Sequence, residues 1–86
     1  MKLYFDEGTG IIHYAINDRD LFNFNPPAGL TEFSIDEIAP DNKAICIDIL
    51  KNYRKHDSNG LSKFYMQSDG GIWNLYERDG WTEEVG

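Results

Sequence analysis

The sequence predicts a small α+β fold, a mostly antiparallel sheet with one helix packed on a face, in the order β-β-β-α-β-β. Two pairs of segments rich in alternating apolar residues flank short glycine-containing turns, at 7–10 and at 68–71, which indicates two hairpins. Apolar residues at helical spacing through 40–55 predict the helix. The chain has 86 residues, of which 21 are Ile, Leu, Phe or Val, so we expect a single domain, 1–86, with a small core.

The first predicted hairpin joins 2–6 to 10–16 through turn-forming residues. Side chains alternate between the two faces of a strand, and both faces of this hairpin receive apolar groups. We therefore expect each face to be covered in part. One face is expected to carry Leu3, Phe5, Ile12, Tyr14 and Ile16, and the other Tyr4, Ile11 and His13.

Residues 17–30 predict a loop, because turn formers begin it and a Pro-Pro pair within it lacks the N–H groups that a strand ladder needs. Phe22 and Phe24 are expected to pin this loop to the domain. Residues 31–37 then alternate between polar and apolar, which predicts a strand. Its inward-facing residues are expected to be Phe33 and Ile35.

The helix predicted over 40–55 has suitable residues at both ends. Pro40 is tolerated in a first turn, Asp41 suits the positive end of the helix dipole, and basic residues gather in the last turn. A strand through 44–49 is the alternative, and the length and end charges favour the helix. The side expected to face the sheet carries Cys46, Ile49, Leu50 and Tyr53.

A second hairpin is predicted from 61–67 and 72–78, joined by a short Asp-Gly turn. Apolar and aromatic residues fall on both of its faces. One face can meet the helix, and the other needs a cover, either the loop 17–30 or another protein chain. The tail is expected to make one more turn and to fray beyond Trp81.

Aromatic residues number twelve in 86, more than so small a core hides completely. Such side chains are enriched at the centres of protein interfaces. We therefore expect a contact with a protein partner or a second copy, the alternative being that the aromatic residues complete the core. The candidate contact residues are Trp73, Tyr76, Trp81, Phe22 and Phe24.

Fifteen acidic and eight basic residues give a net charge of −7, which disfavours direct binding to nucleic acid or to an anionic membrane. No apolar run approaches the roughly 18 residues of a membrane span, and no secretory signal is visible at the start. One acidic stretch lacks any base and is either a solvated face or a surface for a basic partner. Its acids are Glu32, Asp36, Glu37 and Asp41.

The residue patterns predict no catalytic, metal or cofactor site. Cys46 is the only cysteine and lies among isoleucines, where a thiol packs as a small hydrophobic group. His13 and His56 lie far apart in the sequence, without a local partner, and are expected to be structural or solvated. Residues 57–60 resemble part of a calcium loop, but the bidentate Glu that would complete it is missing. We therefore expect a protein that is not an enzyme and uses no cofactor.

Short motifs spread over nearly the whole chain resemble those of one protein group. They are Lys2-x-Tyr4-x-Asp6, Thr9-Gly10, Tyr14-Ala15, Asp20-Leu21-Phe22, Ile35-Asp36-Glu37, Pro40-Asp41-Asn42-Lys43, Cys46-x-Asp48 and Leu75-Tyr76-Glu77-Arg78-Asp79-Gly80-Trp81. In these motifs the chain resembles short proteins encoded by tailed bacteriophages, a group to which no activity is assigned. The resemblance implies a place in the virion or in the host cytoplasm. None of the motifs is a catalytic or ligand-binding signature, so it transfers no functional residue.

Two functions are expected from these observations. The first is a small structural or interaction protein, assembled in several copies as a head, neck or tail component of a phage particle. The aromatic surplus favours it. The alternative is an acidic, host-directed inhibitor that mimics nucleic acid or plugs a basic protein groove, which the base-free stretch 31–41 supports.

Overall fold

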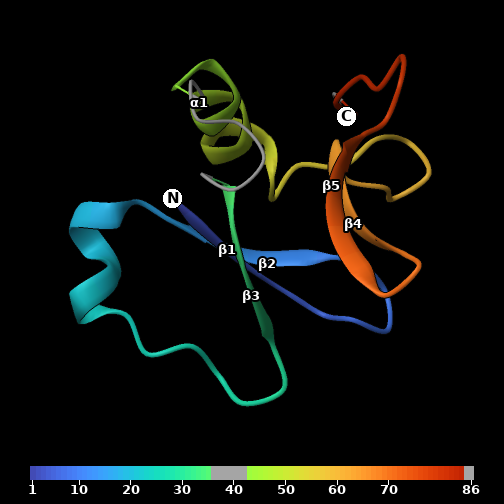
Figure 1. Ribbon diagram of the computed structural model, residues 1–86. Coiled ribbons are helices and arrows are strands. Elements are labelled where there is room, and N and C mark those ends of the chain that lie inside the picture. The colour runs from blue at the N-terminus through green and yellow to red at the C-terminus, as the bar shows by residue number, and fades with distance from the viewer. Residues whose placement is uncertain (36–42, 85–86) are drawn as a thin grey trace.

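The computed structural model describes residues 1–35 and 43–84 and confirms the α+β class (Figure 1). All strand pairs in the described part of the chain are antiparallel. A short 3-10 helix, η1, is inserted between the second and third strands of the predicted order. The elements are β1 (Lys2–Phe5), β2 (Ile12–Ile16), η1 (Asp18–Asn23), β3 (Thr31–Ser34), α1 (Lys43–Asn52), β4 (Phe64–Asp69) and β5 (Ile72–Glu77).

The strands form two sheets, β2-β1-β3 and β4-β5, whereas the alternation pattern alone indicates a single sheet. The two hairpins meet where the N–H of Met66 donates a hydrogen bond to the carbonyl of Gly10 over 2.9 Å. Gly10 has a φ of 73°, and a Cβ at this position would collide with the Met66 carbonyl. The turn of the first hairpin therefore abuts the middle of β4, and the two sheets touch there without pairing along their lengths.

A bulge in β2 decides which residues of the first hairpin share a face. The residues opposite one another are Leu3 and Ala15, Tyr4 and Tyr14, and Phe5 and Ile12. His13 is the extra residue, so Ile12 and Ala15 both turn toward the core although they are three positions apart. The predicted face is consequently wrong for Tyr14 and Ile16, which lie on the outer side of the sheet with Tyr4.

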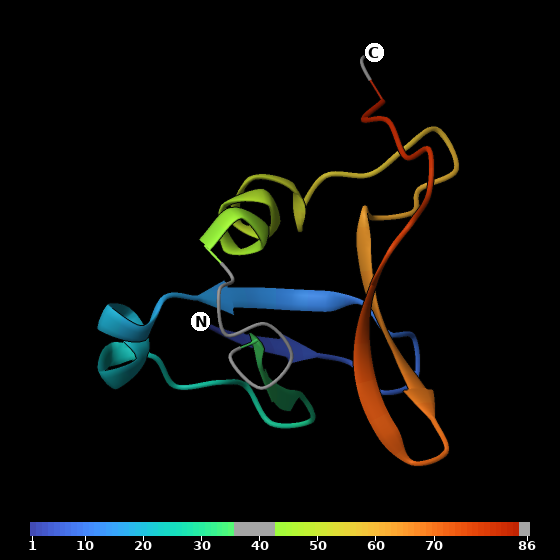
Figure 2. The same cartoon turned by 45° about the horizontal axis from the view of Figure 1, so that its top comes forward.

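The core lies between the inner face of the three-stranded sheet, helix α1 and one face of the β4–β5 hairpin. Figure 2 shows α1 over the sheet and the hairpin standing across one end of it. Phe33 and Ile35 are buried, as predicted. The largest fully buried side chains are Phe5, Phe64, Leu3, Ile35 and Ile49.

Helix α1 is confirmed, and the alternative strand at 44–49 is not formed. The helix ends at Asn52, earlier than the predicted 55, and the predicted first residues, Pro40 and Asp41, lie outside the described residues. The Asn52 amide donates hydrogen bonds to the Asp48 carbonyl and carboxylate, over 3.1 and 2.6 Å. The Asn52 side chain thus bonds back to the residue one turn earlier, at the end of the helix.

Leu50 corrects the predicted helix face. It is 37% exposed, whereas Ile49 is fully buried. Ile45, Cys46 and Tyr53 pack against the core beside Ile49. The helix therefore contacts the core along a narrow stripe of side chains. Leu50 is one residue beyond Ile49, about 100° around the helix, and so lies at the edge of this stripe.

Phe24 anchors the segment 17–30 as predicted, with its ring 5.1 Å from that of Tyr4 and 5.2 Å from that of Tyr14. Phe22 does not, because its side chain is 84% exposed. Phe22 lies within η1, whereas Phe24 follows it in extended backbone, and the Phe24 N–H donates a hydrogen bond to the Leu21 carbonyl. The rings of Phe24 and the two tyrosines cover part of the outer face of the three-stranded sheet.

The second hairpin is confirmed, with a two-residue turn between Asp69 and Ile72. Gly70 and Gly71 have φ values of 63° and 89°. Two successive positive φ values define a type I′ turn, whose twist suits a tight hairpin and which strongly favours glycine.

Candidate functional site

The outer face of the β4–β5 hairpin is the candidate site. Alternation along the two strands turns four apolar side chains, Phe64, Met66, Trp73 and Leu75, toward the core. The opposite face carries Tyr65, Gln67, Asp69, Ile72, Asn74 and Tyr76. We call this second set the outer hairpin face.

Two tyrosines form the aromatic end of the outer hairpin face, away from the turn. Tyr65 and Tyr76 are cross-strand partners, and their rings are stacked with centroids 5.6 Å apart and planes 21° apart. The guanidinium of Arg78 lies 4.3 Å from the centre of the Tyr65 ring, and its Nε donates a hydrogen bond to the Ser62 carbonyl over 2.8 Å. These contacts hold the two rings and the guanidinium in one arrangement.

Asp69 organises the polar end of this face. Its carboxylate accepts hydrogen bonds from the side chains of Tyr76, Asn74 and Gln67. The Tyr76 hydroxyl holds the pKa of Asp69 below its usual range, and the same hydrogen bond raises the pKa of Tyr76. At neutral pH this end of the face therefore carries one negative charge, stabilised by three donors.

Strand β5 is a free edge in the described part of the chain, because its sheet contains only β4 and β5 there. The Met66 N–H points away from β5 toward Gly10, so Met66 and Leu75 are a pair that does not exchange hydrogen bonds. By alternation, the backbone groups of Trp73, Leu75 and Glu77 point away from β4. Within the described residues they have no strand to pair with.

The predicted contact residues do not form one surface. Trp73 faces the core, with its ring 4.8 Å from that of Phe5, and the indole N–H of Trp81 donates to the Leu61 carbonyl over 2.8 Å. Phe24 packs on the tyrosines of the other sheet. Phe22 and Tyr76 remain accessible, but η1 and the hairpin lie on opposite sides of the molecule (Figures 1 and 2).

Sequence reasoning missed Tyr65, Ile72 and Arg78 as parts of the surface. The sequence could have predicted the first two. Pairing residues outward from a Gly70-Gly71 turn sets Tyr65 opposite Tyr76, and alternation then places Ile72 on the same face. Ile72 is 68% exposed. The position of Arg78 depends on how the chain leaves β5, which alternation does not determine.

The acidic stretch is described only at Glu32, since Asp36, Glu37 and Asp41 lie outside the described residues. Glu32 is exposed, but its carboxylate lies 3.3 Å from the Lys2 ammonium and accepts a hydrogen bond from the Tyr4 hydroxyl over 3.0 Å. Burial raises the pKa of this tyrosine, and Glu32 adds to the shift. Much of the Glu32 charge is therefore matched within the chain itself.

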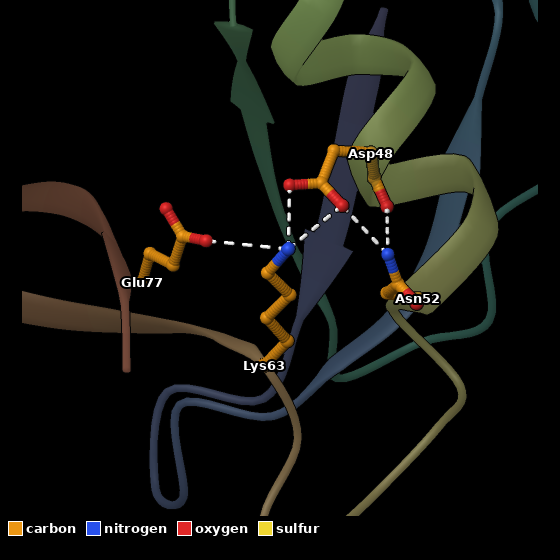
Figure 3. Close-up of polar contacts among 4 residues, drawn as sticks. All are labelled: Asp48, Asn52, Lys63 and Glu77. Carbon is orange, nitrogen blue, oxygen red and sulfur yellow. Dashed lines mark hydrogen bonds and ion pairs between the residues drawn. The ribbon is translucent and has the colours of Figure 1, made fainter. Parts of the chain in front are cut away.

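Lys63 joins helix α1 to the hairpin (Figure 3). Its ammonium lies 2.8 Å from the Asp48 carboxylate and 3.3 Å from that of Glu77. The hydrogen bond to Asp48 raises the pKa of Lys63, so the amine stays protonated and is a poor nucleophile. The cluster acts as a clamp between elements, and Asn52 orients its Asp48 carboxylate.

Two other features are absent from the described part of the chain, a metal cluster and a membrane-spanning helix. The described residues contain no group of three or more His, Cys, Asp or Glu side chains that could hold a metal ion, and no helix long and apolar enough to cross a membrane. Cys46 is half-buried beside the core. No family model, curated protein or solved structure matches this chain.

Proposed function

We propose that this chain is a non-enzymatic interaction protein that associates with a second copy of itself, strand β5 pairing antiparallel with β5 of that copy. The free edge of β5 carries the proposal. Unpaired backbone N–H and C=O groups on an edge strand are a ready template for another strand.

The sequence of β5 suits this pairing. Natural edge strands are commonly protected by lysine, proline or a bulge, and β5 has none of these. Its one charged residue, Glu77, lies at its end. Antiparallel pairing of a strand with itself follows a two-fold axis, so one edge supplies both halves of the contact.

A two-fold axis at Leu75 would set Asn74 of one copy beside Tyr76 of the other. Both residues lie on the outer hairpin face, so pairing would extend that face across four strands and bring two tyrosine stacks together. A repeated, symmetric contact of this kind suits a component present in several copies. The resemblance to bacteriophage proteins makes a phage particle its proposed setting.

Two lysine substitutions test the proposal. Asn74→Lys places a charge at the free edge, where the two-fold axis brings it close to its counterpart. Gln67→Lys is the matched control, because Gln67 lies opposite Asn74 on the same face and donates to the same Asp69 carboxylate. It belongs to β4, whose side away from β5 meets the first hairpin at Gly10 and takes no part in the proposed contact.

Sedimentation velocity across a concentration series measures the outcome. We expect a wild-type dimer, at least a tenfold weaker dimer for Asn74→Lys (about 1.4 kcal/mol) and little change for Gln67→Lys. A wild-type protein that stays monomeric up to millimolar concentration, or equal effects of the two variants, would contradict the proposal.

A further inference from the structure

A basic hollow lies beside the segment that runs from the end of α1 to β4. This segment is yellow in Figure 2. Its volume is about 380 Å³, within the general range of small-molecule sites. Four stretches of chain meet around it: the first turn with the start of β2, the residues after α1, the loop before β4 and the residue after β5. It is lined by Thr9, Ile11, Ile12, His13, Tyr53, Arg54, Lys55, His56, Gly60, Leu61, Ser62 and Arg78.

The charge of the basic hollow is opposite to that of the protein. Arg54, Lys55 and Arg78, three of the eight Lys and Arg residues of a chain with net charge −7, lie in its wall, and no acidic residue does. Both histidines of the chain, His13 and His56, line it as well. Residues that are far apart in the sequence are thus gathered into one cationic wall.

Several of these groups have free hydrogen-bonding capacity. Arg54 stacks on the Tyr53 ring at 5.3 Å, and no carboxylate among the described residues pairs with it. Neither histidine ring forms a hydrogen bond with the described residues. Lys55 is different, because Glu83 of the tail lies 3.4 Å from its ammonium and offsets part of its charge.

The remaining wall is apolar. Ile11 and Leu61 are 48% and 44% exposed, and the Tyr53 ring lies beside them in the lining. Guanidinium groups match phosphate through paired N–H donors, and imidazole and hydroxyl groups add further donors. Flat apolar walls next to such donors suit a ligand that is anionic at one end and apolar at the other.

We infer that the basic hollow binds a small phosphate-bearing molecule with an aromatic or apolar portion, of the nucleoside phosphate class. The phosphate lies against Arg54 and the histidines, and the apolar portion against Ile11, Tyr53 and Leu61. The inference does not rest on β5 or on the outer hairpin face, because Arg54, the histidines, Ile11, Tyr53 and Leu61 lie outside both. Arg78 also lines the hollow, but its guanidinium is held by the Tyr65 ring and the Ser62 carbonyl and is not one of the proposed ligand contacts.

Titration of the ¹⁵N-labelled full chain with ADP tests the inference, with adenosine and inorganic pyrophosphate as separate probes. We expect saturable NMR shifts at the lining residues with ADP. A weaker response to pyrophosphate and a much weaker one to adenosine would show that both portions contribute. Pyrophosphate binding equal to that of ADP would contradict the apolar part of the inference.

Arg54→Gln removes one lining charge without removing any hydrogen bond to the described residues. Lys51→Gln is the matched control, since Lys51 is exposed near the end of α1, carries the same charge and lies outside the hollow. We expect Arg54→Gln to weaken ADP binding about tenfold and Lys51→Gln to change it less than about twofold.

Three outcomes would overturn the inference: no saturable shifts with any probe, shifts centred away from the lining residues, or equal losses in the two variants. The last would mean that the protein responds only to overall charge. Spectra of the unliganded variants, compared with the wild type, establish that each is folded.

Discussion

Truncating Ile49 and Leu50 to alanine, one at a time, tests the narrow contact between α1 and the core. Ile49→Ala removes three carbon atoms from a fully buried side chain. At about 0.8 kcal/mol per buried methylene, the lost transfer energy is about 2.4 kcal/mol, and the cavity left behind raises the cost to about 3–4 kcal/mol. Leu50 is already 37% exposed and leaves no closed cavity, so Leu50→Ala should cost about 1.5 kcal/mol or less.

Urea unfolding followed by tryptophan fluorescence measures both values. A domain of 86 residues has a total stability of about 4–13 kcal/mol, so Ile49→Ala removes a large part of it. If that variant does not fold, Ile49→Val should still cost about 0.5–1.5 kcal/mol. Equal costs for Ile49→Ala and Leu50→Ala would refute the helix orientation described above.

Three further predictions concern the junction of the hairpins and the outer hairpin face. Gly10→Ala should destabilise the fold more than Gly29→Ala in the same urea assay, because both have positive φ but only Gly10 lacks space for a Cβ; equal losses would contradict the close approach to β4. The lowered pKa of Asp69 means that its contribution to stability is present above the ordinary carboxyl pKa and lost as pH falls through the folded-state value. Asp69→Asn should therefore flatten the acid limb of stability against pH. The raised pKa of Tyr76 gives a contribution to stability that is present below the ordinary tyrosine pKa and lost as pH rises through the folded-state value. Tyr76→Phe should therefore flatten the alkaline limb of stability against pH. An unchanged limb in either variant would contradict the hydrogen bond between the two residues.

Local patterns in the sequence predicted the elements well. Both hairpins, the strand with Phe33 inward and the helix around Ile49 follow from periodicity and turn residues, which act over a few positions. Whether the hairpins share one sheet depends instead on the close approach of Gly10 to Met66, a contact between segments more than fifty residues apart. No local pattern carries that information.

The faces of individual residues were less predictable. A single extra residue, His13, shifted Tyr14 to the outer side of its sheet, because the side-chain period of a strand is two. Phe22 was expected to anchor a loop, but it lies in the 3-10 helix η1 and its side chain is exposed. Of the six residues of the outer hairpin face, only Tyr76 was among the predicted contact residues. The inward position of Trp73 depends on which hairpin face meets Phe5.

The basic hollow also gives the molecule an electric polarity. With three of its eight bases drawn into one concavity, the rest of the chain holds fifteen acids against five bases, a net charge of −10. The overall −7 is thus an average over a locally positive concavity and a strongly negative remainder. Fields at a protein surface act over about 8 Å at physiological ionic strength. Within that range an approaching anion is drawn toward the concavity and repelled from most other parts of the surface, so the distribution of charge orients what reaches the molecule.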